Sequence, residues 1–434
     1  MQRFSRSNEA MQVLLCALGG AGIGILVAGL RRGIDLLHRF SFRLPDGQAL
    51  SMGVNVDTER VLFVPVLGGL LLGAGALVAR RFQAREVIDP IEANALHGGR
   101  MSLPASMRLV MATIVSNASG AAVGMEAGYS QLGAVLLAAV GEKLGLRRVD
   151  QRVFVSAGAA AAIAAAFNAP LAGAFYGFEL ILGTYMIRAL APVAAAALTA
   201  VLAEQALIGA QPPFLVGQGF HFKLSVYLLF ALLGILSAGF GILAMQSVTW
   251  VERLLKRIPL PQWLRPAIGG LCLTQMAILL PQILGSGHGA IQFLFDHEWP
   301  LALLLTILVA KLVASAVSIG SGYRGGMFSS SLFLGCMFGA AFADLLALLV
   351  PRLETLHVAL MMVGMGSVVT KSVPDFTLVV GNPARAIGYV CRCGQRLRPV
   401  EGTPATSKTR LQCKDCGRFY ALEDGAVSES GAKV

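Results

Sequence analysis

The stretch SGAAVGMEAGYSQLG, residues 119–133, contains a single charged side chain, Glu126. Glu126 is also the only charged residue between Arg108 and Glu142. The residues around it are apolar or small and suit the interior of a membrane. An ionised carboxylate at membrane depth costs about 3 kcal/mol, so it needs a function or a partner. The fold must therefore provide a polar site for Glu126 inside an apolar segment.

The composition of the whole chain agrees with a membrane location. The 434 residues are 56% hydrophobic and 14% charged, whereas a soluble domain has about 25% charged residues. The first apolar segment has no small-residue cleavage site and is followed by further spans, so we read it as a span and not as a signal peptide. We predict an all-α polytopic membrane protein. Four segments are long enough to cross a bilayer, which takes about 20 residues: residues 11–30, 61–78, 224–245 and 301–319.

The net charge of +11 has a topological explanation. The Lys and Arg residues sit in short clusters at the ends of spans, such as Arg31-Arg32 and Arg80-Arg81. Basic residues that flank spans are typical of membrane topology signals, so we expect no nucleic-acid partner. The clusters do not alternate cleanly, but Arg3 and Arg6 favour a cytoplasmic N-terminus, residues 1–10.

Two stretches of the chain match when it is shifted by 202 positions. SGAAVGMEAGYSQLG is echoed by SGYRGGMFSSSLFLG, residues 321–335. Chance similarity of Gly/Ala-rich helices is the alternative to a duplication. The ordered Ser/Gly register favours a duplicated transporter half, with a first half over residues 11–210 and a second half over residues 222–363. The matched residues include Ser119 with Ser321, Gly120 with Gly322, Gly124-Met125 with Gly326-Met327, and Leu132-Gly133 with Leu334-Gly335.

Both echoes predict a helix that starts inside the membrane. In each, an apolar segment ends in a Ser/Gly-rich stretch, and a new helix is expected to begin at Gly124 or Gly326. Irregular backbone at membrane depth occurs only where it lines a cavity or is buried in protein. The free N–H groups and positive dipole end of such a helix would form an anion site without a formal positive charge. The candidate anion-binding residues are Gly124, Met125, Ala127, Gly128, Gly326, Met327, Phe328 and Ser329.

Two carboxylates stand out as candidates for function. Glu126 could occupy the anion site as a gate that leaves when it is protonated, or it could simply cap its own helix. Glu179, in FNAPLAGAFYGFELILG, could be a proton relay or could face water. The Asn168-Ala169-Pro170 sequence predicts a helix start there, with Pro170 near the first helical position.

Several of these segments resemble motifs of the CLC family of chloride channels and chloride–proton antiporters. GMEAGYSQLG resembles its GREGP-type motif, FNAPLAGAFYGFE its FNAPLAG segment, GGMFSSSLFLG its GxFxP segment, and GSGHGAIQ the loop before the last third of its core. The resemblance covers about residues 10–364. It implies an inverted-repeat bundle of tilted and re-entrant helices, a homodimer, and one anion pathway per subunit. It also implies that Glu126 is the gating glutamate and that the N–H groups of Met327 and Phe328 bind the anion.

The chain also departs from the motifs of that family. Met125 replaces the Arg of GREGP, Ala127-Gly128 replaces its Gly-Pro, and Ser330 replaces the Pro of GxFxP. The anion-coordinating serine of the family's first motif has no counterpart in residues 84–96. Leu180 falls at the position of the internal proton-transfer glutamate, which favours a passive channel or an uncoupled carrier unless Glu179 substitutes.

The tail has a different character. Residues 364–390 alternate apolar and small residues between sharp turns and resemble the closing coil of hexapeptide-repeat acyltransferases. A membrane-tethered sugar N-acetyltransferase fragment is therefore an alternative function, and a non-functional fusion product is another. We expect no enzyme, because the preceding coils with the catalytic histidine are absent and repeat folds need about three units.

The four cysteines of the tail suggest a metal site. Cys391 and Cys393 form one pair and Cys413 and Cys416 another, and each pair is followed by glycine. This resembles a zinc ribbon over residues 391–420, in which four thiolates hold one structural Zn²⁺; free cytosolic thiols are the alternative. Reduced cysteines imply a cytoplasmic tail, and residues 421–434 are expected to be disordered.

The expected function is transport of chloride or a similar small anion across a membrane, gated by Glu126, with no cofactor required for transport. The expected location is the inner membrane of a bacterial-type cell, as a homodimer in contact with lipid.

Overall fold

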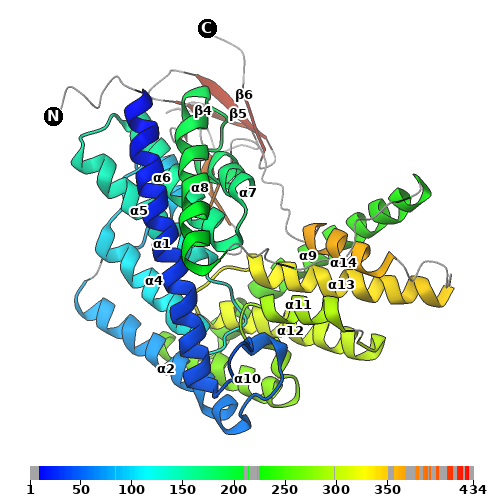
Figure 1. Ribbon diagram of the computed structural model, residues 1–434. Coiled ribbons are helices and arrows are strands. Elements are labelled where there is room, and N and C mark those ends of the chain that lie inside the picture. Colours follow the sequence, from blue (N-terminus) through cyan, green and yellow to red (C-terminus); the bar gives the residue numbers. More distant parts are fainter. Residues whose placement is uncertain are drawn as a thin grey trace.

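The protein is a bundle of helices followed by a small β-rich tail (Figure 1). The computed structural model describes residues 9–83, 85–209, 214, 222, 224–297, 299–349 and 356–367. In the tail it describes residues 377–380, 385–389, 391, 397–399, 408–413, 418–423 and 426–429.

The described residues of the first half form eight α-helices and a π-helical turn. These elements are α1 (Glu9–Phe42), α2 (Thr58–Arg81), α3 (Pro90–Leu96), α4 (Leu103–Ala118), α5 (Glu126–Lys143), α6 (Arg148–Phe167), α7 (Pro170–Tyr176), η2 (Gly177–Leu182) and α8 (Ile187–Ile208). A short 3₁₀ turn, η1 (Leu50–Met52), lies between α1 and α2.

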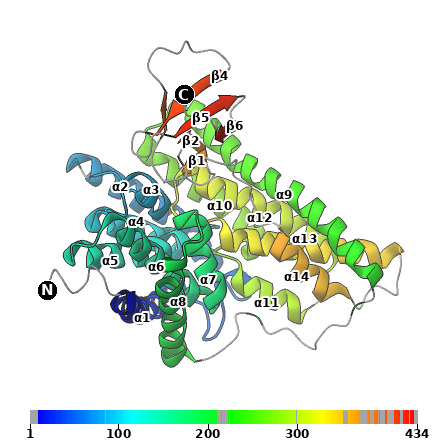
Figure 2. The same ribbon diagram turned by 90° about the horizontal axis from the view of Figure 1, so that it is seen from above.

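The described residues of the second half form six α-helices. These helices lie beside those of the first half in both views (Figures 1 and 2). They are α9 (Leu224–Arg257), α10 (Arg265–Leu279), α11 (His288–Asp296), α12 (Leu301–Ser321), α13 (Phe328–Leu349) and α14 (His357–Ser367). The 3₁₀ turns η3 (Gln262–Leu264) and η4 (Pro281–Ile283) flank α10.

The predicted spans are confirmed as long apolar helices. Within the described ranges, seven helices are long and apolar enough to cross a membrane. Four of them, α1, α2, α9 and α12, contain the four segments predicted from the sequence. Large apolar side chains cover their outer surfaces, for example Leu18, Leu71, Leu228 and Val309, each at least half exposed. Such a surface would be unfavourable in water and suits hydrocarbon.

Local sequence signals explain where several helices begin. Asp57 caps α2 by accepting a hydrogen bond from the N–H of Glu59, and Asp89 caps α3 in the same way. Pro170 is the first residue of α7, as predicted, because a proline at that position loses no helical hydrogen bond. Asn168 ends α6 in the left-handed conformation, with φ 51°.

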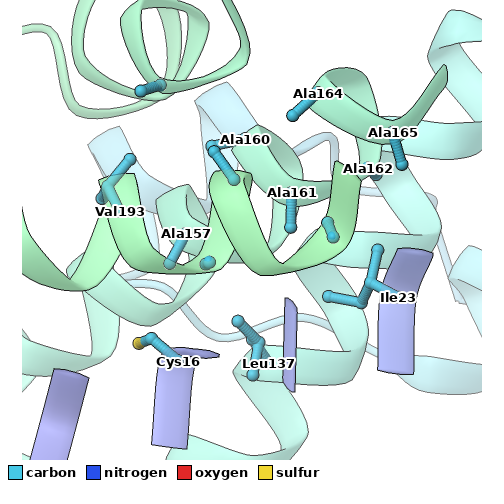
Figure 3. Close-up of a cluster of buried hydrophobic side chains, with 14 of the residues drawn as sticks. Cys16, Ile23, Leu137, Ala157, Ala160, Ala161, Ala162, Ala164, Ala165 and Val193 are labelled. Atoms are coloured by element: carbon cyan, nitrogen blue, oxygen red, sulfur yellow. The ribbon is translucent and has the colours of Figure 1, made fainter. Parts of the chain in front are cut away.

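The core of the first half is built around α6, which is rich in alanine and almost entirely buried. Figure 3 shows its alanines facing Cys16 and Ile23 of α1, Leu137 of α5 and Val193 of α8. A Cβ on Gly133 of α5 would overlap with the backbone of α6. Small residues at these contacts let helix backbones approach closely, which is how membrane helices gain packing energy.

The described residues of the tail form two antiparallel sheets. Strands β1 (Thr377–Val380) and β2 (Arg385–Tyr389) make a hairpin. Strands β3 (Arg398–Pro399), β4 (Lys408–Gln412), β5 (Phe419–Glu423) and β6 (Ala426–Glu429) form the second sheet in sequence order. The described residues of the segment expected to resemble an acyltransferase coil pair antiparallel, and that resemblance stays a prediction. Residues 364–367, at the expected start of this segment, belong to α14, which continues to Ser367.

The prediction of disorder over residues 421–434 was wrong where the structure describes this segment. Residues up to Glu423 complete β5, and β6 follows it. The register pairs Leu422 with Val427. Val427 is buried together with Leu411 and Tyr420. This apolar cluster orders the described part of the segment. The composition of the segment does not show that Val427 has apolar partners in other strands.

Candidate functional site

The two echoed motifs meet in the centre of the protein. The N–H of Gly124 donates to the carbonyl of Gly326, and the N–H of Gly326 donates to the carbonyl of Gly124, each at 2.9 Å. The two glycines form an antiparallel bridge, and they are 202 positions apart. The two halves therefore meet at equivalent residues and run in opposite directions, as an inverted repeat requires.

A second pair of hydrogen bonds has the same symmetry. The N–H of Arg324 donates to the hydroxyl of Ser116 at 2.8 Å. The N–H of Ala122 donates to the hydroxyl of Ser318 at 3.0 Å. The 202-position repeat relates these two bonds, because Arg324 corresponds to Ala122 and Ser116 corresponds to Ser318. In one bond the second half donates to the first, and in the other the first half donates to the second. Chance similarity between two helices would not produce such reciprocal contacts, so the predicted duplication is confirmed.

The helices begin two residues later than predicted. The first residues of α5 and α13 are Glu126 and Phe328, because Gly124 and Gly326 pair with each other instead. The N–H groups of these two glycines are therefore already occupied. Neither N–H is therefore free to donate to an anion, and the place of Gly124 and Gly326 beside the anion stays a prediction. Their role is to hold the two helix starts together and to leave space beside them.

The carboxylate of Glu126 lies on the N-terminus of α13, in the other half of the molecule. Its Oε1 accepts hydrogen bonds from the backbone N–H of Ser329, at 3.0 Å, and from the hydroxyl of Ser329. Glu126 is 8% exposed and Ser329 is 1% exposed. The carboxylate thus reaches across the bridge into the first turn of the opposite helix.

The second carboxylate oxygen, Oε2, is buried and has no hydrogen-bond partner within the described part of the chain. It lies over the two bridging glycines. A Cβ on Gly326 would come within 2.6 Å of Oε2, and a Cβ on Gly124 would overlap with both oxygens. The absence of side chains at these two positions therefore makes the space that the carboxylate fills.

This geometry bears on the two interpretations of Glu126. A simple cap would place the carboxylate on the N-terminus of its own helix. The carboxylate does face its own N–H, but α5 has no capping hydrogen bond from its N-cap residue Met125. The two hydrogen bonds that Oε1 accepts from outside its own residue both come from Ser329 of α13. The carboxylate thus sits where the gate hypothesis requires, and the gating role itself stays a prediction.

The other candidate residues line the two helix starts. Met125 and Met327 immediately precede α5 and α13 and are buried. Ala127 and Gly128 belong to the first turn of α5, whose N–H groups have no intrahelical acceptor. Phe328 begins α13 and is 39% exposed.

An aromatic pair adjoins the start of α13. The rings of Phe328 and Phe167 are 5.0 Å apart in an edge-on arrangement. Phe167 is the last residue of α6 and immediately precedes the FNAPLAG-type helix start. The predicted site segments from both halves therefore come together at this point.

Glu179 lies away from this cluster. It is exposed on η2, and its carboxylate accepts a hydrogen bond from the hydroxyl of Tyr185. Leu180, at the position of the family's internal glutamate, is 51% exposed. The structure thus brings Glu126 together with α13 but does not bring Glu179 to the same site.

Lys311 was not among the predicted site residues. It is a lone charge inside the apolar span 301–319, which is the same signal that singled out Glu126. Its side chain is fully buried, and Nζ donates to the carbonyls of Ile283, at 2.8 Å, and Gly285, at 2.6 Å. The N–H of Gly285 donates in turn to the carbonyl of Gly120. Lys311 therefore holds the loop that supports the first helix start.

Substitution of Lys311 by Met is expected to destabilise the protein. Met has a similar length but no donor, so the carbonyls of Ile283 and Gly285 lose a partner. Such a loss costs about 1–3 kcal/mol, which a thermal unfolding scan in detergent would detect as a lower Tm. Lys256→Met is the control, because Lys256 forms an exposed pair with Glu252 on α9. An equal Tm for both variants would contradict this role.

The tail cysteines fall only in part within the described residues. Cys391 and Cys413 are buried in one cluster with Tyr420, and Sγ of Cys391 lies 3.1 Å from the hydroxyl of Tyr420. Cys393 and Cys416 lie outside the described residues. Among the side chains that the structure describes, no group of three or more potential metal ligands occurs. The zinc site stays a prediction.

Comparison with known proteins decides the family. The sequence profile of the voltage gated chloride channel family matches residues 68–380. This chain belongs to that family. The predicted resemblance and the predicted inverted-repeat membrane fold are confirmed. The match also continues past residue 364, where the resemblance was expected to end.

Individual relatives of this voltage gated chloride channel family cover most of the chain. The voltage-gated ClC-type chloride channel ClcB of Citrobacter koseri is 27% identical over 361 residues, which is 82% of this chain and 86% of the relative. A ClcB-like chloride channel protein of Ralstonia nicotianae is 31% identical over 316 residues, which is 70% of this chain and 72% of the relative. ClcB of Escherichia coli is 28% identical over 365 residues, which is 82% of this chain and 86% of the relative.

Solved structures of the same class share the fold. A slow cyanobacterial Cl⁻/H⁺ antiporter superposes with a TM-score of 0.70 at 21% identity and covers 82% of this chain and 85% of its own. A CLC-type fluoride/proton antiporter superposes with a TM-score of 0.61 at 23% identity. The match covers 82% of this chain and 87% of the antiporter. At these identities the likeness establishes the architecture, including the two opposed halves.

Proposed function

We propose that this protein moves chloride or a similar small anion across the membrane, and that Glu126 gates the pathway. One observation carries the proposal: the Glu126 carboxylate occupies the N-terminus of α13, between two glycines, at the point where the halves meet. A helix N-terminus favours a negative charge because its N–H groups lack acceptors and its dipole is positive. The names of the relatives, which are chloride channels, support chloride as the anion.

The mechanism follows from competition for one site. Oxygen Oε1 of Glu126 stands in for the permeating anion, because it accepts from the donors that an anion would use. Protonation removes the charge of the carboxylate and weakens these charge-assisted bonds. The neutral side chain then leaves, and an anion takes its place at Ser329. Acidification is therefore expected to open the pathway, and a rise in pH is expected to close it.

The position of Glu179 supports weak or absent coupling to protons. It is exposed and bonded to Tyr185, and the neighbouring Leu180 carries no proton-transfer group. We propose a channel or an uncoupled carrier, even though the solved relatives include antiporters. Simultaneous recording of chloride and proton movement would test this. Proton uptake in a constant ratio to chloride efflux would establish coupling and overturn this part of the proposal.

The first test of the function is chloride efflux from liposomes that contain the purified full-length protein. Efflux is measured with a chloride electrode at about pH 4.5, close to the ordinary pKa of a glutamate, and at about pH 7.5, well above it. The expected result is efflux above that of empty liposomes and faster at the lower pH. No efflux from inserted, folded protein would contradict the proposed function.

We further propose a homodimer, in contact with lipid, in the inner membrane of a bacterial-type cell. The exposed apolar side chains of α7 and α8 support a surface that meets lipid or a second copy, among them Leu171, Ile187 and Leu202. Light scattering of the purified protein in detergent would give the number of subunits.

For the tail we propose a structural zinc site and no acyltransferase activity. The burial of Cys391 and Cys413 in one cluster supports the zinc site, and reduced cysteines would place the tail in the cytoplasm. The antiparallel pairing of β1 and β2 argues against a coenzyme-binding coil. Metal analysis and acetyl-CoA titration on the full-length protein would test both statements. A zinc content near zero would contradict the first, and saturable acetyl-CoA binding would contradict the second.

A further inference from the structure

We propose that the hydroxyl of Ser329 is an anion ligand and sets the preference of this protein for small anions over large, diffuse ones. The inference rests on the proposed function, since it concerns the same site. It goes beyond the backbone N–H donors, because it assigns a side chain to the anion and predicts selectivity.

The first argument is the position of the donor. The hydroxyl and the N–H of Ser329 both donate to the same oxygen, Oε1 of Glu126. That oxygen carries the charge that stands in for the anion. A single residue therefore presents two converging donors to one negative atom. An anion that replaces Oε1 would meet both.

The second argument concerns the acceptor that the hydroxyl of Ser329 needs once Glu126 has left. Ser329 is 1% exposed, so water does not reach its hydroxyl in this state. It lies in the first turn of α13, where no preceding helical carbonyl is available to accept from it. When Glu126 leaves, the hydroxyl would be a buried donor without an acceptor, which is unfavourable. An anion at the position of Oε1 removes that penalty.

The neighbouring serine provides a contrast. Ser330 is equally buried, but its hydroxyl donates to the carbonyl of Ala122 at 3.0 Å. It is therefore committed to the backbone of the first half and supports the bridge between the halves. Two adjacent serines of the same helix turn thus have different roles. Of these two serines, Ser329 is the one whose hydroxyl faces the carboxylate.

The third argument is asymmetry between the halves. The residue related to Ser329 by the 202-position repeat is Ala127, which has no hydroxyl. Residues 85–96 of the first half, where the family resemblance places a serine ligand, contain neither serine nor threonine. In this chain the hydroxyl donor therefore comes from the second half, at the start of α13.

The consequence for selectivity follows from the donor type. A hydrogen bond to a concentrated charge is stronger than one to a delocalised charge. Chloride concentrates its charge on one atom, whereas nitrate and thiocyanate spread it over several. Loss of the hydroxyl is therefore expected to weaken chloride binding more than nitrate or thiocyanate binding.

The test uses Glu126→Gln as the parent, so that the gate does not compete with the anion. Ser329→Ala in this parent is expected to weaken chloride binding about tenfold, in line with the loss of one hydrogen bond to a charged group. The ratio of chloride to nitrate efflux is expected to fall by a similar factor. Ser329→Thr, which keeps a hydroxyl, should restore much of the ratio. Ser330→Ala is the matched control and should leave the ratio unchanged.

Calorimetric titration of chloride and nitrate into the purified variants gives a readout that does not depend on transport. Equal chloride affinity and equal efflux ratio in the parent and in Ser329→Ala would overturn the inference. A parent that binds chloride but transports none would contradict the proposed function, and the binding data would still decide the role of Ser329. A folded parent that neither binds nor transports chloride would overturn both.

Discussion

Substitution of Glu126 by Gln is expected to raise chloride efflux at neutral pH about tenfold and to remove its pH dependence. The glutamine keeps the size of the side chain but cannot carry a negative charge. It therefore loses the attraction of the α13 N-terminus and the charge-assisted bonds to Ser329. A loss of about 1.4 kcal/mol from the closed state corresponds to the tenfold change. Liposome efflux at about pH 4.5 and about pH 7.5 measures both effects.

The control for this experiment lies on the same helix. Glu142 is near the C-terminal end of α5 and is exposed, so Glu142→Gln removes one charge without touching the site. The Glu142→Gln variant should keep the pH profile of the wild-type protein. If Glu126→Gln also keeps that profile, protonation of Glu126 does not gate the pathway.

Substitution of Gly124 by Ala is expected to have the opposite effect and to reduce efflux at least about tenfold. A Cβ at this position would overlap with both carboxylate oxygens of Glu126. It would therefore occupy the space that the anion needs after the gate has left. The backbone of Gly124 can accept alanine, since it is not among the residues with positive φ. The hydrogen bonds of the bridge to Gly326 use only backbone atoms and should persist.

A double variant separates the two explanations for an effect at Gly124. If the Cβ only displaced the carboxylate, Gly124→Ala would resemble Glu126→Gln and increase efflux. If it fills the anion site, efflux stays low even when Glu126 is Gln. Gly22→Ala on α1 is the matched control, because a Cβ there meets nothing within 4 Å. Undiminished efflux through the double variant would show that the anion does not pass between Gly124 and Gly326.

Much of the fold was predictable because its signals are local. The apolar spans, the start of α7 at Pro170 and the helix starts after two Ser/Gly-rich stretches depend on short runs of sequence. The repeat was visible because duplicated halves keep the same residues at the same spacing. Glu126 stood out because a lone carboxylate in an apolar segment is costly. Lys311 gave the same kind of signal, but its partners are backbone carbonyls, which no sequence pattern identifies.

The sequence by itself determined that this is a polytopic membrane protein with two related halves, two paired helix starts and one carboxylate between them. Only the tertiary structure decided that Gly124 and Gly326 use their N–H groups on each other, and that Glu126 bonds to Ser329 rather than to its own helix alone. The reason is that these contacts join residues about 200 positions apart, and their geometry depends on how the halves pack. A periodic pattern specifies which residues face inward, whereas the partner that a buried polar group finds is set by the surrounding fold.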